Sequence, residues 1–224
     1  MSANITNTKK VTLLGMLAAI AYAVIFVCHF LIPPVAGFLT LDVKDTIIAI
    51  AGFIFGPLSA ALVGVVVAAV EMVTISATGP LGLIMNILSS CCFACVAALI
   101  YKRKHTLKGA IIGLIVGCLS ATAVMLLWNF LITPIYMGVP RATVAAMLVP
   151  VFLPFNLGKY ILNAALTMRI YKPIVTALRK ANLLAPSSSD AAPVQKKQHL
   201  GTILVSLLIL ITCILGFLVW QGVL

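Results

Sequence analysis

The sequence predicts an all-α integral membrane protein, with a bundle of six helices followed by one additional transmembrane helix. Of its 224 residues, 63% are hydrophobic and only 8% are charged, and the mean hydropathy is +1.22. An average soluble domain has about 25% charged residues, so this composition excludes a soluble domain. Most of the apolar residues also occur in runs of about twenty, the length at which a helix crosses a bilayer.

Seven apolar runs are predicted to be helices, and short polar or Gly/Pro-containing segments separate them. The predicted ranges are 11–31, 45–55, 58–75, 81–101, 109–132, 147–170 and 200–223. The second run is short for a full span. The loops expected at 133–141 and from Tyr171 onward each contain a proline, which commonly ends a helix. The chain therefore divides into a six-helix domain (1–180), a flexible cytoplasmic linker rich in Pro, Ser, Ala and Lys (181–199), and the additional helix (200–224).

The basic residues predict the orientation of the chain in the membrane. With the N-terminus in the cytoplasm, twelve of the 15 Lys and Arg residues fall on the cytoplasmic side, and only Lys44, Arg141 and Lys159 do not. Cytoplasmic loops of membrane proteins are enriched in Lys and Arg. We therefore expect a multi-pass protein of the cell membrane with a cytoplasmic N-terminus, and the net charge of +11 does not indicate a nucleic-acid partner.

Motifs of catalytic and nucleotide-binding sites are missing from the sequence. There is no Ser-His-Asp set, no metal-spaced histidine cluster and no phosphate-binding glycine loop. The six cysteines all lie in apolar runs, where a thiol is usually a small packing side chain. We expect no enzymatic activity and no cofactor. A binding pocket without its own energy source would also need a partner protein.

The segment from Pro154 to Lys159 carries the strongest functional signal. Lys159 lies about ten residues from either end of its apolar run, near mid-bilayer, where a lysine costs at least ~2.5 kcal/mol. Asn156 and Asn163 share its helix face. One interpretation is a polar ligand bound to this stripe. The alternative is a structural ion pair between Lys159 and a buried carboxylate, for which the candidates are Asp42, Asp45 and Glu71.

Two other groups of residues allow more than one interpretation. Gly15, Ala19 and Ala23 form a stripe of small side chains, which would serve close helix packing either inside the bundle or against another subunit. Asp42 and Asp45 precede the second helix, where they are expected to cap its free amide groups. Glu71, near the far end of the third helix, is expected to reach lipid headgroups or a partner rather than the core.

The predicted topology brings several polar residues together in the outer half of the bundle. Asn86, Asn129 and the segment from Pro154 to Lys159 would converge beneath the loop that contains Thr40 to Asp45. Asparagine amides provide both donors and acceptors, which suits the edge of a uracil-like ring. Trp128 and the surrounding apolar side chains suit a flat aromatic body.

Five segments of the chain, in this order, resemble the substrate-binding S components of energy-coupling-factor (ECF) vitamin transporters, above all those specific for riboflavin. The segments are Leu39–Asp45, Gly52–Leu58, Gly82–Asn86, Asn129–Tyr136 and Pro154–Lys159. The resemblance covers about residues 9–180. It implies a six-helix bundle that binds riboflavin in its outer half beneath the first loop. It also implies a membrane partner, the T component, coupled to two cytoplasmic ATPase subunits.

The resemblance also assigns roles to individual residues. Asn129, Asn156 and Lys159 would form hydrogen bonds with the flavin, Leu41 would pack on it, and Asn86 is a weaker candidate for the same site. The small-residue stripe would contact the T component. The family usually ends after its sixth helix, so the linker and the additional helix are extra, and Glu71 stands where basic residues are common.

Three alternatives remain open at this point. The chain could be an S component for another vitamin or precursor, with the same fold and partners. It could be a membrane scaffold whose polar stripe only holds helices together. It could also be an intramembrane enzyme with Lys159 and Glu71 as acid and base, although no nucleophile accompanies them.

Overall fold

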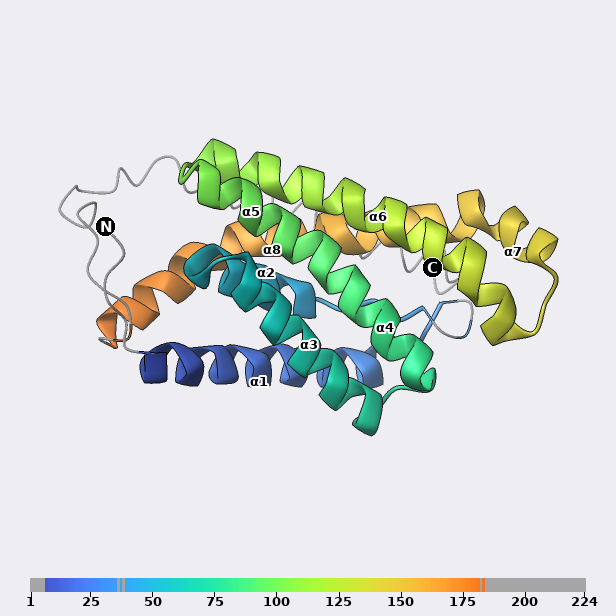
Figure 1. The fold of residues 1–224 in the computed structure, drawn as a ribbon, viewed down its shortest axis with the longest axis horizontal. Helices are drawn as coiled ribbons and strands as arrows, with labels where there is room; N and C mark the ends of the chain where they lie inside the picture. Colours follow the sequence, from blue (N-terminus) through green and yellow to red (C-terminus); the bar gives the residue numbers. More distant parts are fainter. Residues whose placement is uncertain (1–6, 36, 38, 182, 184–224) are drawn as a thin grey trace.

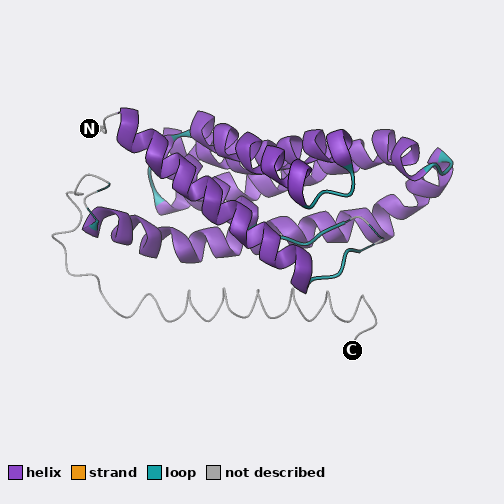
Figure 2. Ribbon diagram, turned by 90° about the horizontal axis from the view of Figure 1, so that it is seen from below, coloured by secondary structure: helices purple, strands orange, loops and turns teal. Residues whose placement is uncertain are grey.

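The computed structural model describes residues 7–35, 37, 39–181 and 183, which form a bundle of helices aligned along one long axis (Figure 1). No β-strand occurs among these residues, and short loops join the helices (Figure 2). The linker and the additional helix predicted after residue 180 lie outside the described residues, apart from Ala181 and Leu183.

The described residues form six helical rods. In chain order these are α1 (Asn7–Leu31), α2 (Lys44–Phe55), α3 (Pro57–Thr74), a rod made of α4 (Gly79–Ser90), η1 (Cys91–Cys95) and α5 (Val96–Arg103), α6 (Leu107–Met137), and a rod made of α7 (Arg141–Met147), η2 (Leu148–Phe152) and α8 (Leu153–Lys180). All of them except α2 are long and apolar enough to cross a membrane. The predicted six-helix membrane bundle is therefore confirmed.

The sixth rod begins at Arg141, six residues before the predicted start. Two predicted C-terminal helix ends are also wrong, and both involve a proline. The sixth rod continues through Pro173 to Lys180, and α6 continues through Pro134 to Met137. A proline removes one backbone hydrogen bond but does not end a transmembrane helix whose other bonds and neighbours are intact. α6 ends at Met137, and its C-cap is Gly138, whose φ of +64° is accessible to glycine with little strain.

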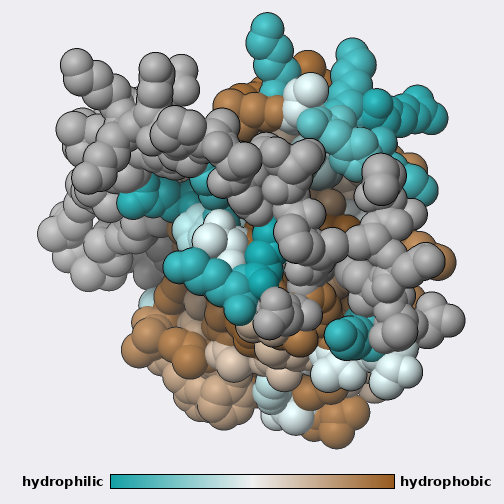
Figure 3. All heavy atoms as spheres, turned by 90° about the vertical axis from the view of Figure 1, so that its left-hand side faces the viewer, coloured by the Kyte–Doolittle hydropathy of each residue, from teal (hydrophilic) through white to brown (hydrophobic). Residues whose placement is uncertain are grey.

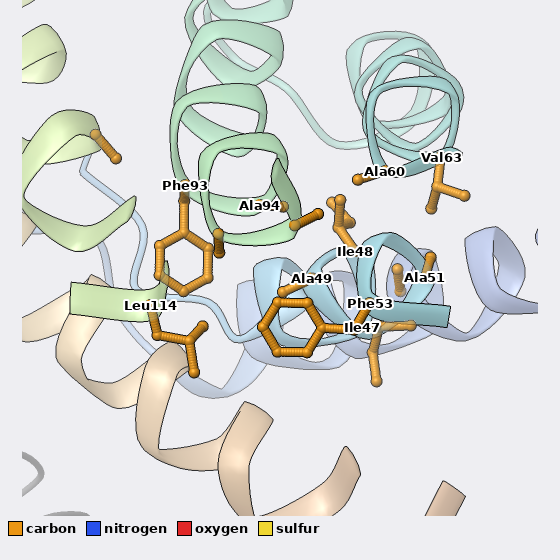
Figure 4. Packing of buried hydrophobic residues seen from close by; sticks show 14 of the residues in the cluster. Ile47, Ile48, Ala49, Ala51, Phe53, Ala60, Val63, Phe93, Ala94 and Leu114 are labelled. Atoms are coloured by element: carbon orange, nitrogen blue, oxygen red, sulfur yellow. The ribbon is translucent and has the colours of Figure 1, made fainter. Parts of the chain in front are cut away.

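The short helix α2 forms the centre of the bundle. Its residues from Lys44 to Phe53 are all buried. Figure 4 shows Ile48 and Phe53 of α2 packed among Val63 of α3 and Phe93 of η1, with Leu114 of α6 nearby. Because the other rods surround α2, its length is set by the core and not by the thickness of the bilayer.

Small residues let neighbouring helices approach closely. A Cβ atom added to Gly117 of α6 would lie 2.5 Å from the carbonyl oxygen of Phe93, and one added to Gly113 would lie 2.7 Å from that of Ala97. Such backbone-to-backbone contact is typical of helix pairs in membranes. These two glycines therefore fix the position of α6 against η1 and α5.

Basic residues gather at one end of the bundle. The start of α1, the α5–α6 turn and the end of α8 carry Lys9, Lys10, Lys102, Arg103, Lys104, Lys108, Lys172, Arg179 and Lys180. Figure 3 shows this end, where hydrophilic side chains are concentrated above a more apolar flank. The buried charged residues lie toward the opposite end of the bundle, near the start of α2.

Candidate ligand-binding site

Five ionisable side chains are buried together in the described part of the bundle. They are Asp42, Lys44, Asp45, Glu71 and Lys159, and none is more than 7% exposed. We call them the charge cluster. A buried charge costs several kcal/mol unless it is paired and hydrogen-bonded, so the partners of each group determine what the cluster does.

Lys159 of α8 forms an ion pair with Asp42 in the loop that precedes α2. Its Nζ lies 2.7 Å from Oδ2 of Asp42. Of the three carboxylates considered from the sequence, Asp42 is therefore the direct partner. Asn163, one turn further along α8, reinforces this connection, because its Nδ2 donates to the backbone oxygen of Asp42 at 2.9 Å.

Asn163 also holds the first turn of α2. Its Oδ1 accepts a hydrogen bond from the backbone N–H of Thr46 at 2.8 Å and one from the Thr46 hydroxyl at 3.0 Å. Asn163 and Thr46 are both buried. The face of α8 that carries Asn156, Lys159 and Asn163 thus lies in the interior, against the loop and the start of α2.

A second ion pair connects Lys44 at the start of α2 with Glu71 of α3. The other oxygen of the Glu71 carboxylate accepts a hydrogen bond from Nδ2 of Asn86 at 2.8 Å. The expectation that Glu71 reaches headgroups or a partner is therefore wrong. Lys44 of the central helix provides the counter-charge that holds Glu71 inside.

Asp42 joins the two ion pairs. Its Oδ1 accepts a hydrogen bond from the backbone N–H of Lys44 at 3.2 Å, while its Oδ2 accepts from Lys159. Burial alone would raise the pKa of the Asp42 carboxyl, but the charges of Lys159 and Lys44 and their hydrogen bonds outweigh burial and lower this pKa. Asp42 is therefore held as an anion.

The predicted capping of α2 holds for only one of the two aspartates. Asp42 accepts an amide N–H at the helix start, as expected. Asp45 instead accepts a hydrogen bond from the hydroxyl of Ser90, at the junction of α4 and η1. The residue in the N-cap position is Val43, whose side chain forms no cap hydrogen bond.

Asn129 and Asn156 are buried, and their hydrogen bonds stay within their own helices. Nδ2 of Asn129 donates to the carbonyl of Met125, and Nδ2 of Asn156 donates to that of Phe152, each at 2.8 Å. Thr133 donates to Oδ1 of Asn129 at 2.9 Å. A ligand could therefore replace these bonds without breaking a contact between helices.

Trp128 and Leu41 lie in two different apolar surroundings. Trp128 lines a pocket between α4 and α6, together with Met85, Thr133 and other residues of these helices. Leu41 packs against a small cluster in which Phe152 and Phe155 of the sixth rod meet the loop. The structure therefore places Asn86 with Glu71, Lys159 with Asp42, and Trp128 at the α4–α6 pocket.

Sequence reasoning did not identify all the partners in this region. Thr46, Ser90 and the Lys44–Glu71 pair were not assigned to the site. The available signal was the rarity of carboxylates in the chain, which has only four Asp and Glu residues. Asp42, Asp45 and Glu71 lie in apolar surroundings, and each of these carboxylates needs a counter-charge or another compensating group.

The small-residue stripe lies on the outer face of α1. Gly15, Ala19 and Ala23 are exposed, whereas Leu17 and Ala21 face the core. A Cβ atom added to Gly15 would meet no heavy atom within 4 Å. Among the described residues, the stripe is thus not used for packing inside the bundle.

The sequence matches a family model described as "ECF transporter, substrate-specific component" over residues 9–171. A riboflavin transporter RibU from Staphylococcus aureus (strain TCH60) is 31% identical over 186 residues, covering 79% of this chain and 96% of the relative. Riboflavin transporter FmnP from Bacillus subtilis (strain 168) is 28% identical, covering 79% of this chain and 99% of the relative.

A solved structure is similar in fold. It is described as "Structure and mechanism of the S component of a bacterial ECF transporter", with a TM-score of 0.66 and 29% sequence identity. The match covers 78% of this chain and 99% of the other. On the family-model match and these relatives, this chain belongs to the substrate-specific (S) component family of ECF transporters.

Proposed function

We propose that this protein is the membrane subunit that captures riboflavin from outside the cell and delivers it inward with an ATPase-driven ECF module. It is thus a transport subunit and not an enzyme. The observation that carries the proposal is Lys159, an ammonium group buried on the same face of α8 as the amides of Asn156 and Asn163. Two curated relatives at 28–31% identity are named riboflavin transporters, which supports this choice of ligand.

The chemistry of the three proposed hydrogen-bonding side chains fits one edge of the flavin. The uracil-like end of the ring system presents two carbonyl oxygens and an N–H group. Lys159 has three N–H donors, and its ion pair with Asp42 uses one of them, so others are available to a carbonyl. Asn129 and Asn156 offer both donors and acceptors for the remaining groups.

Other residues would contact the flat body of the ligand. Leu41, on the loop over the cluster, would pack on the ring system, and Trp128 would offer an aromatic surface. Asn86 donates a hydrogen bond to Glu71 in this structure, so its proposed contribution is to hold the charge cluster in place.

Delivery of the ligand requires partners. We propose that a T component and two ATPase subunits act with this chain, and that Gly15, Ala19 and Ala23 provide the contact surface for the T component. Their exposed position on α1 supports this assignment. The concentration of basic residues at one end of the bundle supports a cytoplasmic N-terminus.

Riboflavin binding by single-site variants tests the proposed site. Lys159→Ala and Asn129→Ala should each weaken binding by about 10- to 100-fold, since a hydrogen bond that involves a charged or buried group contributes about 1.5–3 kcal/mol. Binding is measured by the quenching of riboflavin fluorescence on titration with purified protein. Lys108→Ala, at the opposite end of the bundle, is the matched control and should bind as the wild type does.

A folding check accompanies the lysine variant. Lys159→Ala leaves Asp42 without its ion-pair partner, so the double variant Lys159→Met/Asp42→Asn should restore the fold but not the affinity. Wild-type affinity in Lys159→Ala or Asn129→Ala would contradict the assignment of that residue to the site. Binding of a different vitamin by the wild type, with no affinity for riboflavin, would keep the fold and change the ligand.

A further inference from the structure

The charge cluster contains one carboxylate more than it has lysines. Its acidic members are Asp42, Asp45 and Glu71, and its basic members are Lys44 and Lys159. Lys159 pairs with Asp42, and Lys44 pairs with Glu71. Asp45 is the member without a lysine partner, and the riboflavin proposal gives it no role.

Asp45 is completely buried, with an exposed fraction of 0%. Its Oδ1 accepts a hydrogen bond from the hydroxyl of Ser90. Its Oδ2 is buried and has no hydrogen-bond partner among the described residues. One oxygen of this carboxyl group thus accepts a hydrogen bond from Ser90, while the other accepts none from the described residues.

Titratable and charged groups from the helices packed around the start of α2 surround the region of Asp45. Those that interact with Asp45 itself are Lys159 and Tyr160 of α8, Ser90 and Cys91 of the α4–η1 segment, and Asp42 and Lys44 of its own segment. Glu71 of α3 and Cys28 of α1 interact with Lys159 instead. The hydroxyl of Tyr160 forms a hydrogen bond with the hydroxyl of Ser89, with 2.7 Å between the two oxygen atoms. Both lysines donate to other carboxylates, so neither neutralises Asp45 directly.

An ionised Asp45 would leave the cluster with a net charge of −1 in a site shielded from water. Burial of an uncompensated carboxylate is far more costly than burial of a neutral carboxyl group, even one with an unpaired O–H. A proton on the unpartnered Oδ2 removes this net charge, and the neutral acid keeps its hydrogen bond from Ser90 on Oδ1.

We propose that Asp45 is a buried proton-binding site, with the proton on Oδ2 and the hydrogen bond from Ser90 on Oδ1. The proton comes from water when the site forms, and no other bond changes. The cluster then contains two ion pairs and one neutral acid, so it carries no net charge. Any displacement of the cluster across the membrane would then move no net charge through the transmembrane potential.

Infrared spectroscopy of the purified full-length protein in detergent at pH 7 tests the proposal directly. A protonated carboxyl group has a carbonyl stretch that ionised carboxylates lack, and it shifts when H2O is replaced by D2O. With only four Asp and Glu residues in the chain, the background from other side chains is small. The wild type should show one such band, and its absence would overturn the proposal without reference to any variant.

Three variants test whether the carbonyl band belongs to Asp45. Asp45→Asn should abolish it, and Ser90→Ala should shift its frequency, because Ser90 donates to this carboxyl group. Asp190 is the one Asp or Glu residue of the sequence that the charge cluster does not include. Asp190→Asn is therefore the matched control and should leave the band unchanged. A band that persists in Asp45→Asn, or that Ser90→Ala does not move, would overturn the assignment to Asp45.

The thermal midpoint provides an independent readout. Asp45→Asn replaces a neutral acid with a neutral amide, so its midpoint should stay within about 3 °C of the wild type, which is the shift expected from a minor change in a chain of this size. Asp42→Asn, which removes a paired anion, should have a lower midpoint. An Asp45→Asn protein as unstable as Asp42→Asn, or wild-type stability that rises with Na⁺ at constant ionic strength, would show that Asp45 is ionised.

Discussion

At the scale of single residues, Asp42 connects the loop to the helices around it. Its carboxylate forms an ion pair with Lys159 of α8 and accepts a hydrogen bond from the backbone N–H of Lys44 in α2. Its backbone oxygen accepts a hydrogen bond from Nδ2 of Asn163 in α8. The contacts with Lys159 and Asn163 join segments 117 to 121 residues apart in sequence. A change at Asp42 should therefore affect both the stability of the bundle and the position of Lys159.

Asp42→Asn should destabilise the protein by about 3 kcal/mol. Breaking a buried ion pair typically costs about 3–5 kcal/mol, and the charge of Glu71, which also acts on Lys159, places this variant at the lower end. The thermal midpoint of the detergent-solubilised protein measures the loss. Asp42→Asn/Lys159→Met should recover most of it, and a single variant as stable as the wild type would show that the pair contributes little.

The partner of Lys159 could not be predicted from the sequence for a physical reason. Asp42, Asp45 and Glu71 were equally plausible, because the path of the loop and the depth of α3 decide which carboxylate reaches α8. Glu71 was misplaced because its position near the end of α3 suggested exposure. Its burial depends on Lys44, a residue of a different helix.

At the scale of the elements, helix existence was predictable but helix ends and irregularities were not. Apolar runs in the sequence identified every rod, including the short α2. The continuation through Pro134 and Pro173 was missed, because it depends on neighbouring helices that compensate for a lost backbone hydrogen bond. The π-helical turns η1 and η2 have no simple sequence signal, although η1 begins directly after Ser90, the partner of Asp45.

A pair of glycine variants separates packing inside the bundle from contact with a partner. Gly117→Leu should destabilise the isolated subunit by about 1–3 kcal/mol or more, because its Cβ atom would lie 2.5 Å from the carbonyl oxygen of Phe93. Gly15→Leu should not lower stability, since its position on α1 is open. Thermal midpoints of both purified variants measure this difference.

The same pair tests the proposed partner surface. When the T component and ATPases are co-expressed, Gly15→Leu should lose co-purification with them while it keeps riboflavin binding. A Gly15→Leu protein that assembles normally would contradict the proposed role of the Gly15, Ala19 and Ala23 stripe. A Gly117→Leu protein as stable as the wild type would contradict the close packing of α6 against η1.

At the scale of the whole molecule, charge is divided between the two halves of the bundle. Basic side chains gather at the end formed by the start of α1 and the end of α8, while every described carboxylate lies in the charge cluster. Composition and apolar runs were enough to predict a membrane bundle. The convergence of α2, α3, α4 and α8 on one cluster could be predicted only roughly, because helix order in space depends on packing between distant segments.

The most direct test of the central claim is an absorption spectrum of the wild-type protein purified in mild detergent, followed by titration with riboflavin. The account predicts flavin absorption bands that stay with the protein through gel filtration, or quenching of riboflavin fluorescence that saturates at one ligand per chain. A colourless protein that also leaves the fluorescence of added riboflavin unchanged would contradict riboflavin capture by this S component.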